Sequence, residues 1–262
     1  MSDYQVIAKN YSESSENRIH SDEIAKKLGF TGALVPGVAV YGHLTHPLVA
    51  QFGESWLANS YSNLRLLKPT YDGDHLVLTL STSEGNPATH EVQCFNNQRE
   101  LLATVSSHLP AQDISIEPYL KLLDNPIKTL ERPEIAWDNV IPEQAFAPWT
   151  FEVSPQANQT YTSEVSDPLD VYTTHAHPHL LCGIANTALV NEYQMPTWIH
   201  VGTETNHLQP VMVGDELSVR PAVIEKWKKK GHEFIRIFVG LWVGEELKTY
   251  MLHTAIFKVA GT

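Results

Sequence analysis

The stretch LLKPTYDGDHLVLTL, residues 66–80, has a weaker copy in HLQPVMVGDELSVRP, residues 207–221. The two stretches are separated by a constant offset of 141 residues. At that offset the identical pairs are Leu67 and Leu208, Pro69 and Pro210, Gly73 and Gly214, Asp74 and Asp215, and Leu76 and Leu217. Because similarity at a fixed offset marks a repeated structural unit, the sequence predicts two related halves.

Each copy follows an apolar segment of helix length and belongs to a group of strand-like runs. The helical segments are GVAVYGHLTHPLVAQFG at 37–53 and PHLLCGIANTALVNEY at 178–193. Alternation and β-branched residues predict strands at 60–69, 74–83, 89–96 and 100–109, and again at 199–210, 216–227, 232–243 and 247–259. The fold class is therefore α+β, with an antiparallel sheet wrapped around one helix in each half.

A proline-rich crossover is expected between the halves. Residues 112–150 contain repeated prolines but are too apolar for a free linker, so we expect them to pack on the two halves. The predicted organisation is an N-terminal unit at 1–111, a crossover at 112–150 and a C-terminal unit at 151–262.

The charge balance narrows the classes of partner. The 262 residues carry a formal net charge of −12, so their long-range field repels nucleic acids and anionic membranes. The N-terminus has no basic region followed by an apolar core, and no segment approaches the roughly 20 apolar residues that span a bilayer. We expect a cytoplasmic protein that binds neither nucleic acid nor membrane. The cysteines, Cys94 and Cys182, are expected to be buried thiols.

One segment of the first half resembles a known family. ENRIHSDEIAKKLGFTGALVPGVAVYG, residues 16–42, is similar to the signature of the MaoC-like, or (R)-specific enoyl-CoA hydratase, family. That signature reads Asp-x-Asn-Pro-x-His-x-Asp, then a short helix ending near Gly-Phe, then His-Gly before a central helix. The matching residues are Asn17, His20, Asp22, Ala25, Gly29, Phe30 and Gly37. The resemblance implies a double hotdog fold, in which two antiparallel sheets each wrap a central helix.

The resemblance also implies a hydratase or dehydratase that acts on an acyl thioester. His20 would transfer the proton, Asn17 would share the site, and the backbone N–H groups around Gly37 would form the oxyanion hole. Two family residues are replaced: the catalytic aspartate by Ser15, and the histidine before the helix glycine by Pro36. We expect no overhanging helical segment before the central helix of the second half, and its absence would leave room for an acyl tail.

No cofactor is expected, because the substrate itself would be carried on coenzyme A or phosphopantetheine. A small-molecule acyl thioester is the expected partner, and an acyl carrier protein and a homodimer remain open. Lys228, Lys229 and Lys230 form a basic run in an acidic chain and are candidate contacts for the coenzyme phosphates. Their alternative interpretation is a solvated hairpin tip.

Other interpretations of the histidines remain open. His20 would otherwise cap or pack against the following helix, where Asp22 is expected to be structural and Ser21 to be the N-cap. Asp170 and His175 have the family's Asp-to-His spacing, so the second half could carry the base.

The alternating His175, His177 and His179 could ligate zinc on one face of an extended segment. However, Pro178 and the apolar run after it indicate the start of a helix, so no metal is expected. The alternatives to a hydratase are a catalytically degenerate acyl-binding or assembly homologue, and a thioesterase or lyase acting on an unusual substrate.

Overall fold

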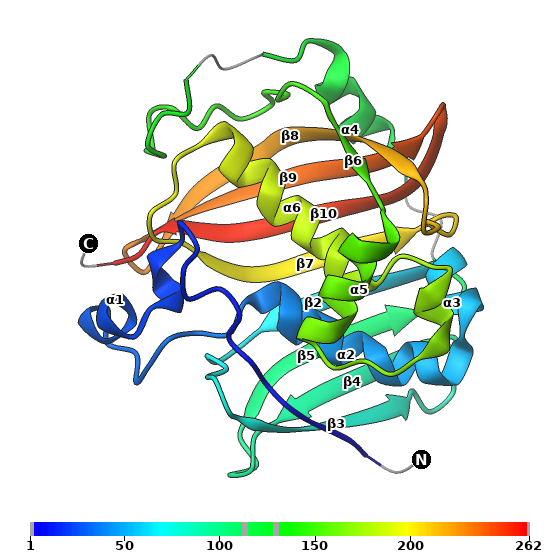
Figure 1. Ribbon diagram of the computed structural model, residues 1–262. Helices are drawn as coiled ribbons and strands as arrows, with labels where there is room; N and C mark the ends of the chain where they lie inside the picture. The colour runs from blue at the N-terminus through cyan, green and yellow to red at the C-terminus, as the bar shows by residue number, and fades with distance from the viewer. Residues whose placement is uncertain (1–2, 112–114, 128–130, 261–262) are drawn as a thin grey trace.

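The computed structural model describes residues 3–111, 115–127 and 131–260 and contains both predicted central helices (Figure 1). They are α2 (Gly37–Phe52) and α6 (Pro178–Glu192), which begin at the same offset of 141 residues as the repeated sequence. Residues 38–49 of α2 are all buried. A helix that is apolar around most of its circumference needs such an enclosure.

The predicted strands are present, and two short strands flank them. In the first half they are β2 (Ser60–Leu66), β3 (His75–Thr82), β4 (Thr89–Phe95) and β5 (Leu101–His108). In the second half they are β7 (Ile199–His207), β8 (Glu216–Lys229), β9 (His232–Val243) and β10 (Glu246–Lys258). The additional strands, β1 (Tyr4–Ile7) and β6 (Trp149–Glu152), pair with β3 and β8. Four residues are too few for a clear alternation, so the sequence did not reveal them.

Within the described residues, the ten strands form one antiparallel sheet in the order β1-β3-β4-β5-β2-β7-β10-β9-β8-β6. The halves join edge to edge through β2 and β7, where Ser60 pairs with His207 and Leu64 with Thr203. The two predicted sheets are therefore the two halves of one continuous sheet. Each half of the sheet lies against its own central helix (Figure 1).

Each half has its own core between the central helix and the inner face of the sheet. Leu44 of α2 and Val92 of β4 are buried in the first core, and Leu180 of α6 and Ile237 of β9 in the second. The two helices also contact each other. Residues from both halves are thus brought together at the middle of the molecule.

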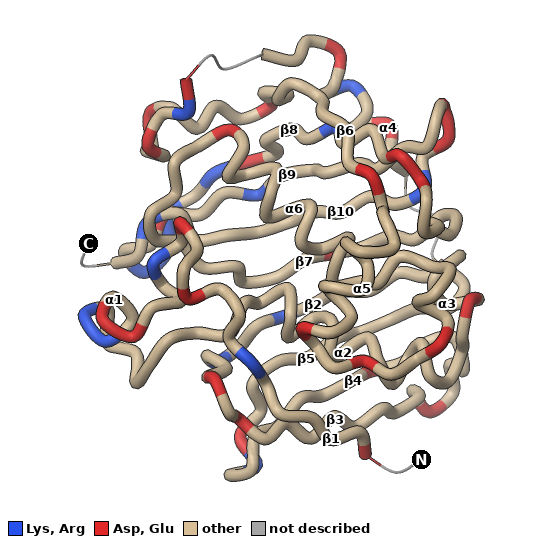
Figure 2. The backbone as a smooth tube through the Cα atoms, viewed as in Figure 1, with Lys and Arg blue, Asp and Glu red and all other residues tan. Residues whose placement is uncertain are grey.

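The remaining helices are short. They are η1 (Arg18–His20), α1 (Asp22–Lys27), α3 (Glu54–Ala58), α4 (Glu117–Leu120), η2 (Lys121–Asp124), α5 (Pro155–Glu164) and η3 (Asp170–Thr173). Charged side chains lie mostly on α1, the turns and the outer segments, whereas α2 has no Asp, Glu, Lys or Arg (Figure 2). Within the described parts of the chain, no helix has the length and apolar character needed to cross a membrane.

The crossover packs on the folded body as expected. Tyr119 stacks on Phe238 with 5.5 Å between ring centroids, on the face of the sheet opposite α6. Further along, Arg132 forms an ion pair with Glu16 of the first half at 2.9 Å. The end of the predicted crossover, from Trp149, already belongs to β6. Residues 112–114 and 128–130 lie outside the described residues, and the two boundaries between the three predicted units stay a prediction.

Candidate active site

His20 is the last residue of η1, in the loop before α1. Its Nδ1–H donates to the carbonyl oxygen of Leu34 at 2.7 Å. Because a carbonyl oxygen only accepts, this bond keeps the proton on Nδ1 and leaves Nε2 unprotonated. Burial lowers the pKa of His20, and the hydrogen bond to Leu34 opposes that effect, so the ring is neutral at pH 7. A neutral imidazole with a free Nε2 is the form that a general base requires.

Asn17 ties the His20 loop to the second half. Its Nδ2 group donates to Nε2 of His20 at 3.3 Å and to the carbonyl oxygen of Trp198 at 2.9 Å. Its Oδ1 accepts from the backbone N–H of Trp198 at 3.1 Å. The 3.3 Å contact is long for a hydrogen bond, so Nε2 is only weakly engaged and remains able to accept a proton.

Gly37 begins α2, and its N-cap residue, Pro36, offers no side-chain hydrogen bond. The N–H groups of Gly37 and Val38 have no partner among the described residues, as is usual in a first helical turn. They form a pair of donors at the positive end of the helix dipole. A Cβ at Gly37 would lie 2.5 Å from Leu66 Cδ1 and 2.7 Å from His200 Nδ1, so close packing also requires glycine here.

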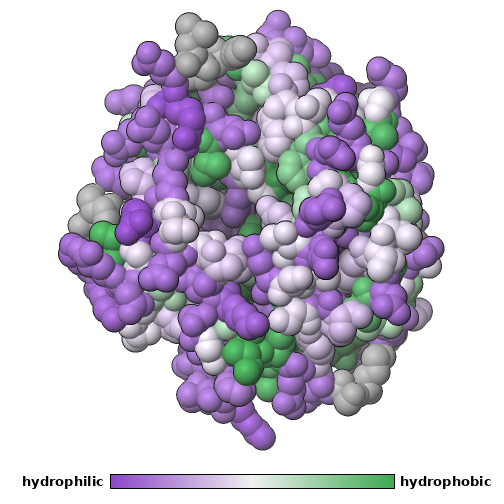
Figure 3. Space-filling model, viewed as in Figure 1, coloured by the Kyte–Doolittle hydropathy of each residue, from purple (hydrophilic) through white to green (hydrophobic). Residues whose placement is uncertain are grey.

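Two cavities meet at His20. The first, of about 200 Å³, has largely apolar walls from both halves, including Phe30, Leu66 and Val201. The second, of about 550 Å³, lies between the N-terminal loop, α5 and α6, where the surface is hollowed (Figure 3). We call it the polar cavity because more of the residues in its wall are polar than in the first, although much of its lining surface is apolar. The residues that line both cavities are Asn17, His20, Pro36, Asn186 and Trp198. The His20 ring is therefore accessible from both cavities.

Neither Ser15 nor its neighbour Glu16 takes the place of the family's catalytic aspartate. Ser15 lines the polar cavity, and its hydroxyl donates to the carbonyl oxygen of Asn17 at 3.2 Å. The carboxylate of Glu16 binds Arg132 and accepts from the backbone N–H of Met195 at 3.0 Å. Among the described residues that line the apolar cavity, none is an aspartate or glutamate. Proton transfer in that cavity would therefore depend on imidazole.

Asp22 has the structural role expected of it. Its carboxylate pairs with Lys26 at 2.8 Å and accepts from the backbone N–H of Ala33 at 2.8 Å. Ser21 occupies the N-cap position of α1 but makes no side-chain capping bond, because its hydroxyl donates to the carbonyl oxygen of Arg18 at 2.8 Å.

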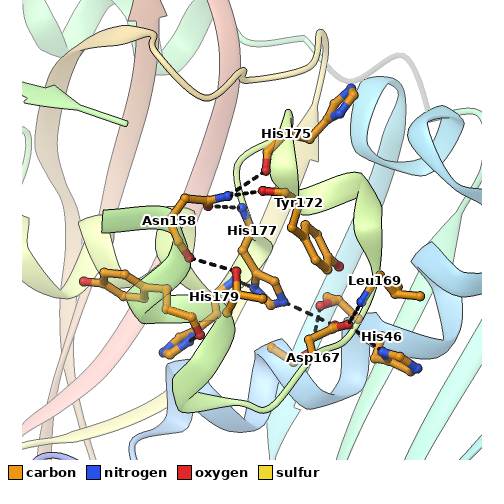
Figure 4. A network of polar contacts seen from close by, with 12 residues as sticks. His46, Asn158, Asp167, Leu169, Tyr172, His175, His177 and His179 are labelled. Carbon is orange, nitrogen blue, oxygen red and sulfur yellow. Dashed lines mark hydrogen bonds and ion pairs between the residues drawn. The ribbon is translucent and has the colours of Figure 1, made fainter. Parts of the chain in front are cut away.

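The alternating histidines of the second half belong to a buried polar network between the central helices (Figure 4). The Nδ1 atom of His177 accepts from the backbone N–H of His179 at 3.0 Å, so its Nε2–H is the donor to Asp167 at 3.3 Å. The other carboxylate oxygen of Asp167 binds Nδ1 of His46, on α2, at 2.9 Å. Burial would raise the pKa of Asp167, but the hydrogen bonds from His177 and His46 hold it well below its usual range.

Asp170 and His175 do not form a catalytic pair despite their spacing. Asp170 is exposed on η3, whereas Nδ1 of His175 contacts the hydroxyl of Thr174 at 2.9 Å. His175 instead supplies its carbonyl oxygen to the buried side chain of Asn158 at 2.9 Å (Figure 4).

The second half has a helix, α5, before its central helix, so the expectation that no helical segment precedes α6 is wrong. Ser154 caps α5 by accepting a backbone N–H at 3.1 Å, and Pro155 occupies its first turn. This Ser-Pro pair is a helix-start signal that the sequence contains. Tyr161 of α5 packs over Gly183 of α6, where a Cβ would lie 2.8 Å from the tyrosine ring.

One buried group in the described part of the chain has metal-ligand chemistry. A ligand atom from each of Cys182, His200 and His253 lies within 4.8 Å of the others. The hydroxyl of Thr203 lies among them, at 2.7 Å from His200 Nε2 and 2.8 Å from His253 Nδ1. Since the hydroxyl already binds both nitrogens, this group is a hydrogen-bonded cluster.

Lys228, Lys229 and Lys230 lie at the end of β8 and in the turn that leads to β9. This position agrees with the alternative interpretation of the three lysines as a hairpin tip. Lys228 pairs with Glu233 at 2.8 Å and lies 4.4 Å from the ring centroid of Trp137. Lys229 and Lys230 are exposed. None of the three lines either cavity at His20, and coenzyme binding by them stays a prediction.

Second-half residues complete the site, and the sequence reasoning did not find them. They are Asn186 of α6, Trp198 and His200. No local motif marks these positions. Trp198 and His200 reach His20 because β7 pairs with β2 and because the side chain of Asn17 binds the backbone of Trp198, whereas Asn186 is placed by α6.

No protein-family model and no curated protein sequence matches this chain. Solved structures do match it. One, from Chloroflexus aurantiacus and described as a MaoC-domain dehydratase, gives a TM-score of 0.64 at 11% identity over 98% of this chain and 95% of its own. A Mycobacterium tuberculosis protein described as a double hotdog gives 0.63 at 12% identity over 98% and 96%. This chain has the double hotdog fold.

The same fold also occurs in a protein with a different described activity. An oleoyl thioesterase from Lactobacillus plantarum gives a TM-score of 0.55 at 11% identity over 100% of this chain and 97% of its own. The double hotdog predicted from the signature and the repeat is therefore confirmed. Because a fold can carry several activities, the function has to be argued from the site.

Proposed function

We propose that this protein is an acyl-thioester hydro-lyase, which adds water across the Cα–Cβ bond of an enoyl thioester or removes it in reverse. The observation that supports this most directly is the position of His20. Its ring carries an unprotonated Nε2 and lines both the apolar and the polar cavity, and Gly37 and Val38, whose N–H groups are unpaired among the described residues, each line one of these cavities.

The site has the groups that each step requires. During hydration, Nε2 of His20 takes a proton from water, and the water oxygen bonds to Cβ. The electron pair of the double bond moves toward the carbonyl and forms an enolate, whose oxygen accepts from the N–H groups of Gly37 and Val38. The imidazolium then returns its proton to Cα, which restores the carbonyl and the neutral ring. One imidazole acts as base and then as acid.

The solved structures support this proposal at the level of the fold. Proteins described as a MaoC-domain dehydratase and as an oleoyl thioesterase both share the double hotdog. We place hydration first because the motif around His20 matches the hydratase signature. Hydrolysis of the thioester, or binding without turnover, would use the same cavity and the same helix N-terminus.

The test compares His20→Ala and His20→Gln with His75→Ala, which alters an exposed histidine at the start of β3. Hydration of crotonyl-CoA and of longer 2-enoyl-CoA substrates is followed together with release of free thiol. Both His20 variants are expected to lower kcat by roughly 100- to 10,000-fold, the usual contribution of one acid–base group, while His75→Ala retains activity. Thiol release without hydration would identify a thioesterase. Binding with neither reaction would identify an acyl-binding protein.

A further inference from the structure

A second imidazole lies beside the helix N-terminus of the candidate site. His200 lines the apolar cavity together with His20, and only 6% of its surface is exposed. Its Nδ1 is buried without a hydrogen-bond partner among the described residues. A Cβ on Gly37 would lie 2.7 Å from this nitrogen, so Nδ1 is directly next to the first residue of α2. The hydratase-like motif at residues 16–42 does not include the His200 imidazole.

The opposite nitrogen of His200 is held by a chain of buried polar groups. Its Nε2 lies 2.7 Å from the hydroxyl of Thr203, which lies 2.8 Å from Nδ1 of His253. The two imidazole rings are stacked with 4.3 Å between their centroids. The thiol of Cys182 donates to the same hydroxyl at 3.8 Å. The ring of His200 is therefore fixed in position from the side away from the cavity.

The direction of these hydrogen bonds can be inferred from the donors and acceptors available to His200 and His253. A threonine hydroxyl has one proton to donate and two lone pairs to accept. If His253 and Cys182 donate to Thr203, the hydroxyl proton goes to Nε2 of His200, and His200 carries its own proton on Nδ1. Either direction leaves one ring N–H without a protein acceptor among the described residues, the Nδ1–H of His200 in the first and the Nε2–H of His253 in the reverse. His200 lines the apolar cavity, where a bound ligand can accept this bond, whereas His253 lines neither cavity at His20. Because unpaired buried N–H groups are rare, the first direction is favoured.

We infer that His200 is a hydrogen-bond donor contributed by the second half, whose Nδ1–H binds the carbonyl oxygen of the acyl thioester beside the N–H of Gly37. This inference rests on the proposed function, because it assumes an acyl thioester in the apolar cavity. Thr203 and His253 are positioning residues that select the Nδ1–H form of the ring. The arrangement gives this site a further oxyanion donor where the family's carboxylate is absent from the loop.

The electrostatics of the cluster agree with a neutral donor. Burial lowers the pKa of His200 to about 3, against an opposing contribution from the Gly202 carbonyl. Burial also lowers the pKa of His253 well below its ordinary value, with a smaller effect from His200. Both rings are therefore uncharged at pH 7. A neutral N–H stabilises charge that develops on the carbonyl oxygen without giving up its proton.

The first test measures the tautomer directly and does not depend on turnover. In protein labelled with ¹⁵N-histidine, His200 is expected to show a protonated Nδ1 and an unprotonated Nε2. Thr203→Val keeps the shape but removes the hydroxyl and is expected to abolish this preference, whereas Thr203→Ser should retain it. Addition of butanoyl-CoA, which has no double bond to hydrate, should shift the Nδ1–H resonance. A protonated Nε2 in the wild type, or no response to butanoyl-CoA, would overturn the inference.

The second test measures the contribution to catalysis. Removal of one oxyanion donor typically lowers kcat by about 100- to 1,000-fold, so we expect that loss for His200→Phe with little change in KM. Thr203→Val should show part of the loss and Thr203→Ser should recover it. Hydration that depends on His20 but not on His200 would refute the inference and leave the proposed function intact. A wild type that hydrates nothing, yet shifts the His200 resonance with butanoyl-CoA, would refute the proposed function and support the donor.

Discussion

Asn17 and Trp198 are joined by two hydrogen bonds that run in opposite directions. Nδ2 of Asn17 donates to the carbonyl oxygen of Trp198 at 2.9 Å, and the N–H of Trp198 donates to Oδ1 at 3.1 Å. One side chain thus pairs with a backbone position 181 residues away. The same amide contacts Nε2 of His20, so the orientation of the candidate base depends on both halves of the chain.

Asn17→Ala should therefore weaken both the fold and the site. It leaves the N–H and carbonyl of Trp198 without their partner, and an unsatisfied buried group costs about 1 to 3 kcal/mol. We expect the free energy of unfolding, measured by urea denaturation, to fall by about that amount. Asn97→Ala, in the exposed turn between β4 and β5, is the matched control and should change it little. An unaltered unfolding free energy for Asn17→Ala would show that the bridge contributes nothing.

Ser15→Asp restores the carboxylate that the hydratase signature has at this position. Ser15 lies at the polar cavity together with His20, so a carboxylate here would have access to water near Nε2. We expect faster hydration of crotonyl-CoA if the loop has merely lost a second acid–base group. The control is Ser12→Asp, which places the same charge elsewhere around this cavity. Equal effects of the two substitutions would assign the change to charge alone, and no gain from either would contradict the hypothesis of a lost catalytic position.

Much of the architecture could be predicted because it is recorded locally in the sequence. The helices that begin at Gly37 and Pro178 are long apolar segments, and the fixed offset relates one half to the other. The short strands at 4–7 and 149–152 were missed because their positions depend on pairing with β3 and β8. Edge strands of this length acquire their structure from a neighbour and leave little periodicity of their own.

Only the first-half residues of the site could be predicted, because only these lie together in one segment of the sequence. His20, Asn17 and Gly37 occupy one segment of the chain, so a single motif contains all three. Trp198 and His200 reach the same place only through pairing of β2 with β7, which no short pattern records. The sequence also does not indicate which nitrogen of the His20 ring carries the proton. That depends on the carbonyl oxygen of Leu34, in a later loop, which accepts from Nδ1.

The basic turn between β8 and β9 gives a separate prediction about the ligand. Lys228 already pairs with Glu233, which leaves Lys229 and Lys230 as exposed cations for a coenzyme phosphate. Lys229→Glu combined with Lys230→Glu should weaken coenzyme A binding and flatten its dependence on salt concentration. Isothermal titration across a range of salt concentrations measures both. Arg99→Glu combined with Lys121→Glu changes the net charge equally at exposed positions elsewhere. Equal losses in the two double variants would indicate a general charge effect and would leave the lysines as a solvated turn.

The buried histidines should make the fold sensitive to acid, and His43 allows a clear test. It is 2% exposed on α2, and neither of its ring nitrogens has a partner among the described residues. Burial lowers its pKa to about 4, His177 adds to the effect, and Asp167 opposes it. Below the ordinary histidine pKa of about 6.5, the unfolded chain binds a proton that the folded chain does not, so stability must fall as the pH falls from about 7 to about 4.

His43→Leu removes that titration. Between about pH 7.5 and about pH 5, the wild type should lose about 2 kcal/mol more unfolding free energy than the variant, since acid no longer has this buried group to protonate. Urea denaturation at both pH values measures the difference. His75→Leu, at an exposed position on β3, should reproduce the wild-type dependence. If His43→Leu loses as much stability in acid as the wild type does, then the His43 ring gains a proton in the folded state as readily as in the unfolded state. Its burial between α2 and α6 would then not be what destabilises the protein in acid.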